Sequence, residues 1–141
     1  MTRDSIVRAS WWGTAVFGAT AVAGAAAPHP LAPVALVIAA AMFVVGCVLL
    51  LRSLVLAAAR SRTESIDVLG LYFLTGDVPP TVRRHLLGSL VVEAAIGVAT
   101  AAVRPYTTSA AGVLAPVYAL GLCGLWAARF GRFGPRQRST L

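Results

Sequence analysis

Apolar residues fall into four long blocks that are separated by short polar segments. The blocks cover residues 10–27, 31–52, 86–103 and 110–130. A helix needs about 20 consecutive apolar residues to cross the hydrocarbon core of a bilayer, and these blocks approach or reach that length. The pattern therefore predicts an all-α fold: a transmembrane four-helix bundle that forms one domain over residues 1–141.

The first block admits two interpretations. It is barely long enough to span a bilayer, and basic residues before an apolar run that ends in small residues are also typical of a signal peptide. Trp11 and Trp12 favour a span, because tryptophan concentrates at membrane interfaces. Pro28 follows the last alanines and would make a poor cleavage site.

The second block is predicted to continue as one helix past Arg52 for about two turns, and Pro116 is predicted to kink the fourth.

The cytoplasmic connector, residues 60–85, is the only sizeable polar segment. A short amphipathic helix at the interface is predicted within it, ended by Gly76 and followed by a helix that Asp77 caps. The connector is either a passive link or a docking surface. The apolar positions at helical spacing are Ile66, Leu69, Tyr72 and Phe73.

Charge sets the expected orientation. The net charge is +7, and all 12 basic residues are arginines. Four spans place every arginine except Arg104 on the side of the two termini, and this side includes the basic tail at 131–141. Both termini should therefore be cytoplasmic, and the protein should lie in the cell membrane. Trp11, Trp12 and Trp126 should lie at the same inner interface. The arginines expected to contact anionic lipid headgroups are Arg52, Arg83, Arg84, Arg129 and Arg132.

Few motifs for catalysis or binding occur in the chain. It has no CxxC, no HExxH and no phosphate-binding glycine loop, and no span holds a pair of carboxylates. Cys47 and Cys123 lie inside apolar blocks and are expected to act as small hydrophobic residues. The arginines flank apolar blocks, which argues against nucleic acid as a partner. The sequence predicts no catalysis, no cofactor and no metal site.

Glu93 is the exception, because it lies near the middle of the third block. A charged side chain there costs about 2.5–3.5 kcal/mol on insertion scales, so it should face the bundle or a partner. Small and polar residues share its helix face at intervals of four, as expected for close helix packing. These residues are Ser89, Gly97 and Ala101.

Depth counting along the blocks suggests neighbours for Glu93. Tyr118 on the fourth block is the first candidate for a hydrogen bond, and Thr20 on the first block is the second. Three roles stay open: a proton or cation site, a structural acid that fixes helix register, and a contact with a larger partner protein.

The C-terminal half carries a resemblance. The run LTGDVPPTVRRHLLGSL, the RPYT turn and the segment GLWAARFGRFGPR resemble the small uncharacterised integral membrane proteins of actinobacteria. That resemblance implies no activity. We expect the protein to be a structural or accessory subunit of a larger membrane assembly. Its expected partners are membrane lipids and either other subunits or copies of itself. The alternative is a small oligomeric transporter or channel that uses Glu93. The first block holds no acid, unlike the first span of small multidrug transporters.

Overall fold

The computed structural model is all-α and describes residues 2–105 and 108–135. Four long helices and two short helical segments follow one another along the chain. The elements are α1 (Arg3–Ala26), α2 (Pro28–Arg60), α3 (Val68–Phe73), α4 (Pro80–Val103), the 3-10 helix η1 (Thr108–Leu114) and α5 (Pro116–Phe130).

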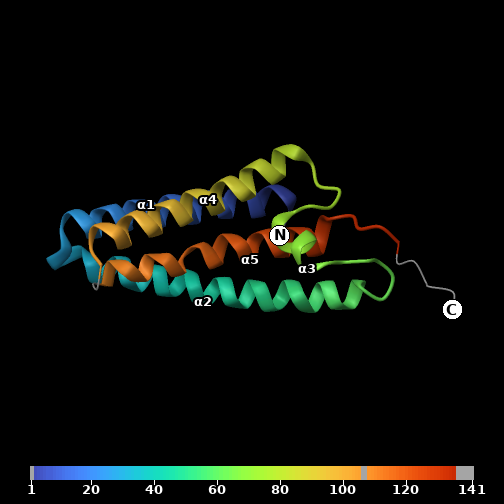
Figure 1. Ribbon diagram of the computed structural model, residues 1–141, viewed down its shortest axis with the longest axis horizontal. Coiled ribbons are helices and arrows are strands. Elements are labelled where there is room, and N and C mark those ends of the chain that lie inside the picture. Colours follow the sequence, from blue (N-terminus) through green and yellow to red (C-terminus); the bar gives the residue numbers. More distant parts are fainter. Residues whose placement is uncertain (1, 106–107, 136–141) are drawn as a thin grey trace.

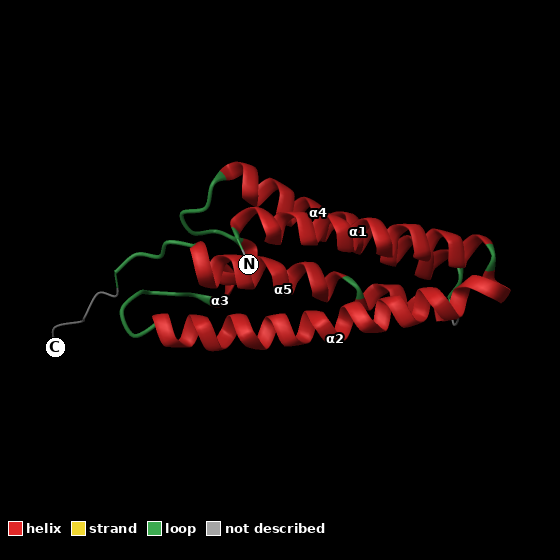
Figure 2. Ribbon diagram, turned by 180° about the vertical axis from the view of Figure 1, so that it is seen from behind, coloured by secondary structure: helices red, strands yellow, loops and turns green. Residues whose placement is uncertain are grey.

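The long helices lie side by side along the long axis of the molecule (Figure 1). In both ribbon views α5 lies between α2 on one side and the pair α1 and α4 on the other (Figures 1 and 2). The start of α1, the short helix α3 and the end of α5 share one end of the bundle, and the α1–α2 turn lies at the other. The arrangement brings the arginine-rich segments together at one end.

Three helical stretches of the described chain are long and apolar enough to cross a membrane. They are His29–Arg60, Pro80–Val103 and Ala110–Phe130. The helix α1 is not among them, because polar and small residues such as Ser10 and Thr14 lower the hydropathy of its apolar segment. The second, third and fourth predicted spans thus correspond to suitable helices, and the first span stays a prediction.

Two predictions about helix continuity are confirmed. The helix α2 is uninterrupted from Pro28 to Arg60, so it passes Arg52 without a break. The fourth apolar block is divided at Pro116, where η1 ends and α5 begins. Proline lacks the N–H that would continue the preceding helical hydrogen bonds, which explains why it begins a new helix.

The connector holds one short helix, and its predicted position at the membrane interface stays a prediction. The helix α3 has only 6 residues. Leu69 and Phe73 are 64% and 47% exposed, whereas Leu71 and Tyr72 are buried in the main core with Trp126. Leu74 ends the helix in a left-handed conformation with φ 55°, so the chain turns before a regular helical face can develop.

The predicted cap at Asp77 is wrong. Asp67 instead caps α3, since its carboxylate accepts a hydrogen bond of 3.0 Å from the Gly70 N–H. The Asp77 N–H donates to the Arg132 carbonyl at 3.3 Å, which ties the connector to the chain after α5. The helix α4 begins at Pro80 without a side-chain cap.

Arg60 joins the end of α2 to the end of α5. Its guanidinium donates hydrogen bonds to the carbonyls of Ala128 at 2.8 Å and Gly131 at 3.0 Å. It also pairs with Glu64 at 2.8 Å. A cation at a helix C-terminus satisfies carbonyls that lack a helical partner and opposes the negative end of the helix dipole.

The other predicted surface residues divide into two groups. Arg129 is half-buried, and Trp126 is 1% exposed with its ring in the core and against Phe130. Trp126 therefore faces the bundle, and its depth at the inner interface stays a prediction. Cys123 is buried in the core, as expected. Residues 136–141 of the predicted tail lie outside the described residues. The other arginines predicted to contact lipid headgroups are exposed: Arg52, Arg83, Arg84 and Arg132.

Candidate functional site

Glu93 faces the interior of the bundle. Its side chain is 0% exposed. Ser89 and Gly97, one turn away on either side, are buried as well, which confirms the predicted packing face. Ala101 is only half-buried, and Thr100 occupies the buried position instead.

The carboxylate of Glu93 is bound by α1. The Thr14 hydroxyl donates a hydrogen bond of 2.9 Å to Oε1 of Glu93, and it also lies 3.0 Å from the Ser10 carbonyl oxygen. One turn toward the start of α1, the hydroxyls of Ser10 and Ser89 are in contact. Polar side chains of α1 therefore meet polar side chains of α4 at two successive turns.

A constant register relates α1 and α4. The pairs Ser10–Ser89 and Thr14–Glu93 are each separated by 79 residues. The same separation of 79 residues recurs near the far end, where Arg104 donates to the Ala25 carbonyl at 3.1 Å. Two parallel helices in fixed register produce such a series. These pairs therefore hold α1 against α4 between residues 10 and 25 of α1.

The predicted partners of Glu93 are wrong. The Tyr118 hydroxyl donates instead to the Ala9 carbonyl at 3.1 Å. The Thr20 hydroxyl bonds within its own helix, to the Val16 carbonyl at 2.8 Å. Depth counting could not identify Thr14, because it does not give the rotation of α1 about its axis. The matching intervals of Ser10–Thr14 and Ser89–Glu93 were the available signal.

The two carboxyl oxygens of Glu93 differ in their hydrogen bonding. Among the described residues, Oε2 of Glu93 has no hydrogen-bond partner and essentially no accessible surface. Of the other acidic residues, Asp4 precedes Thr14 by ten residues, about 15 Å along α1, and Glu64, Asp67 and Asp77 lie in the connector, so none of them is placed to pair with Glu93. Within the described chain no group of three or more metal-ligating side chains occurs. The geometry supports a helix-joining role for Glu93.

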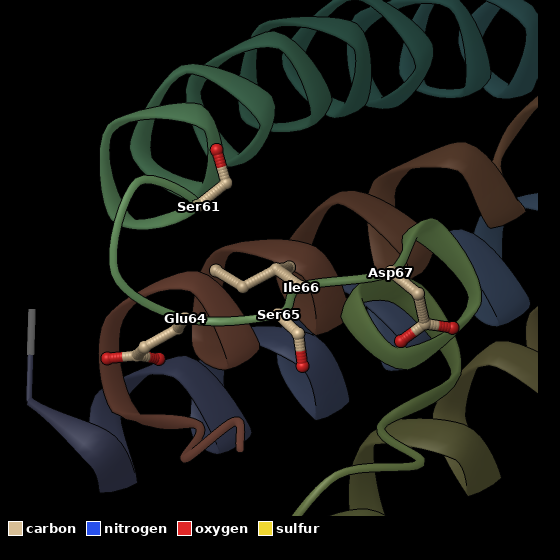
Figure 3. Close-up of a pocket in the computed structure, with 5 residues that line it drawn as sticks. All are labelled: Ser61, Glu64, Ser65, Ile66 and Asp67. Carbon is tan, nitrogen blue, oxygen red and sulfur yellow. The ribbon is translucent and has the colours of Figure 1, made fainter. Parts of the chain in front are cut away.

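A hollow of about 490 Å³ lies at the arginine-rich end, lined by Ser61, Glu64, Ser65, Ile66 and Asp67 (Figure 3). Its two carboxylates already have partners in the fold. Glu64 pairs with Arg60, and Asp67 caps α3. The hollow therefore offers a polar surface without an unused acid, and we assign it no chemistry.

Comparison with protein-family models, curated proteins and solved structures finds no match to this chain. The resemblance to actinobacterial membrane proteins stays a prediction.

Replacing Thr14 with valine should destabilise the bundle by about 1–2 kcal/mol, because it leaves the buried Glu93 without its hydrogen bond. The cost should fall when Glu93 is replaced by leucine in the same chain. A double-mutant cycle on unfolding in detergent measures this coupling. Thr20→Val is the matched control, since its hydroxyl bonds only within α1. Additive effects of Thr14→Val and Glu93→Leu would refute the pairing.

Proposed function

We propose that the protein is an integral membrane protein of the cell membrane without catalysis of its own. In this proposal α1 crosses the bilayer together with α2, α4 and α5, both termini are cytoplasmic, and the bundle serves as a structural or accessory subunit of a larger membrane assembly. Support for the orientation comes from the arginine-rich segments at the end that holds the start of α1 and the end of α5.

The enclosure of Glu93 carries the proposal. A transport site must be reached by its ion, whereas Glu93 is 0% exposed and receives a hydrogen bond from Thr14. An acid in this position stabilises helix association, since its neutral form can hydrogen-bond across two helices in a medium without water.

A seam of exposed side chains on α2 supports an assembly role. Its members recur at alternating intervals of four and three residues, the spacing that lets one helix pack into another by knobs into holes. Five of them are 58–70% exposed: Val37 at 66%, Val44 at 60%, Val48 at 58%, Leu51 at 64% and Val55 at 70%. The complete seam consists of Val37, Ala41, Val44, Val48, Leu51 and Val55. We propose that a transmembrane helix of a partner subunit packs along it.

Affinity purification from native membranes tests this assembly role. We expect a membrane protein to co-purify with the wild-type chain, and Val48→Trp to reduce its yield about tenfold or more because the new ring blocks the seam. Val98→Trp is the matched control, because Val98 is 62% exposed on α4. Recovery of the wild-type chain alone, or equal loss with both variants, would contradict the proposal.

The second candidate function is a small oligomeric transporter or channel that uses Glu93. The unpartnered Oε2 favours it, because a buried oxygen without a hydrogen bond is costly and such groups concentrate at functional sites. This candidate requires a second conformation in which water reaches the carboxyl group.

A further inference from the structure

An apolar groove of about 420 Å³ opens on the surface between α1 and α2. Aromatic rings form part of its lining, and the remaining wall is aliphatic. Among its lining residues are Ala9, Trp12, Gly13 and Val16 on α1, Met42 and Val45 on α2, and Tyr118 on α5.

The groove exists because Tyr118 is wedged between the two helices. A Cβ at Gly13 would collide with the Tyr118 ring, and one at Gly46 would come within 2.6 Å of the Tyr118 backbone nitrogen. The hydroxyl of Tyr118 is fixed by its bond to the Ala9 carbonyl at 3.1 Å. The groove is therefore held by the fold.

Two arginines stand at the same end of the groove. Arg52 follows Val45 by seven residues, two turns along the same face of α2, and Arg8 directly precedes Ala9, which lines the groove on α1. Arg52 lies about 10 Å beyond Val45 along α2, whereas Arg8 lies directly at the end of the groove, and both are at the depth of the headgroups in the proposed orientation. Both are exposed, and neither has an ion-pair or hydrogen-bond partner among the described residues.

We propose that this groove binds one anionic phospholipid. An acyl chain lies against Trp12 and Tyr118, and the phosphate is held by Arg52 and Arg8. The site rests on the proposal that α1 and α2 cross the bilayer. A second copy of the chain fits this face less well, because a twofold contact here would bring the unpaired arginines of the two copies together.

Native mass spectrometry of the full chain, exchanged into detergent with equal phosphatidylglycerol and phosphatidylcholine, tests the site. We expect one phosphatidylglycerol per chain, retained in preference to phosphatidylcholine. Arg52→Gln should lower the retained phosphatidylglycerol about tenfold, because a charge-assisted contact to phosphate is lost. Arg84→Gln is the matched control, since Arg84 is exposed on α4 and does not line the groove.

A second variant keeps the test independent of charge. Val16→Trp fills the groove from a position that is 45% exposed, so it should fold and should lower retention of both lipids. Equal effects of Arg52→Gln and Arg84→Gln, equal retention of the two lipids, displacement by soluble glycerol phosphate, or a lipid-free dimer would overturn the proposal. A chain that is soluble without detergent would refute the membrane assignment itself, whereas an embedded chain without bound lipid refutes only this site.

Discussion

Replacing Gly46 with leucine is expected to cost about 3 kcal/mol or more and to prevent α2 from packing on α5. A Cβ at Gly46 would lie 2.6 Å from the carbonyl carbon of Val117 and 2.7 Å from its oxygen. These are backbone atoms of a packed helix, so they cannot move aside as a flexible side chain can, and overpacking of this kind destabilises proteins by about 1–3 kcal/mol or more.

Gly88→Leu provides a control with the opposite sign. Gly88 lies in α4, and a Cβ there meets nothing within 4 Å. The leucine should raise stability by up to about 1 kcal/mol, because glycine is a poor helix former. Both variants can be compared by unfolding in detergent followed by circular dichroism. Equal stability of the Gly46 and Gly88 variants would show that α2 and α5 do not approach as closely as described.

Replacing Arg60 with alanine is expected to destabilise the bundle by about 2–3 kcal/mol. The change removes hydrogen bonds to two carbonyls at the end of α5, and bonds to charged groups are worth about 1.5–3 kcal/mol each before screening. The ion pair with Glu64 adds less, since the Arg60 and Glu64 side chains are 29% and 28% exposed. Thermal unfolding in detergent measures the loss.

Two variants isolate the role of the guanidinium. Arg62→Ala removes an exposed neighbouring arginine and should change stability by less than about 0.5 kcal/mol. Arg60→Lys keeps the charge but loses the planar fork that reaches both carbonyls, so it should recover only part of the stability. If Arg60→Lys matched the wild type, charge alone would account for the effect and the two carbonyl bonds would be unimportant.

The sequence predicted the long helices well because their apolar blocks are long and uninterrupted. The block at 31–52 corresponds to α2, which extends to Arg60, and the proline at position 116 divides the fourth block where expected. Burial of Glu93, Ser89 and Gly97 on one face followed from the interval of four residues. These features depend on local spacing alone.

Features set by tertiary packing were not predicted. The pairing of Thr14 with Glu93 depends on the parallel register of α1 and α4, which are distant in sequence. The length of α3 was not predicted, because the Asp67 cap and the turn at Leu74 confine that helix to 6 residues. Arg60 reaches α5 only because of the contact between α2 and α5.

We propose that Glu93 joins α1 to α4 and carries no ion. Proton flux into proteoliposomes tests it most directly, with a membrane potential or pH gradient applied across the bilayer. We expect vesicles holding the wild-type chain and vesicles holding Glu93→Gln, a variant that can still accept the Thr14 hydrogen bond, to leak protons at the same rate as empty vesicles. A flux that depends on the wild-type chain and disappears with Glu93→Gln would contradict the claim.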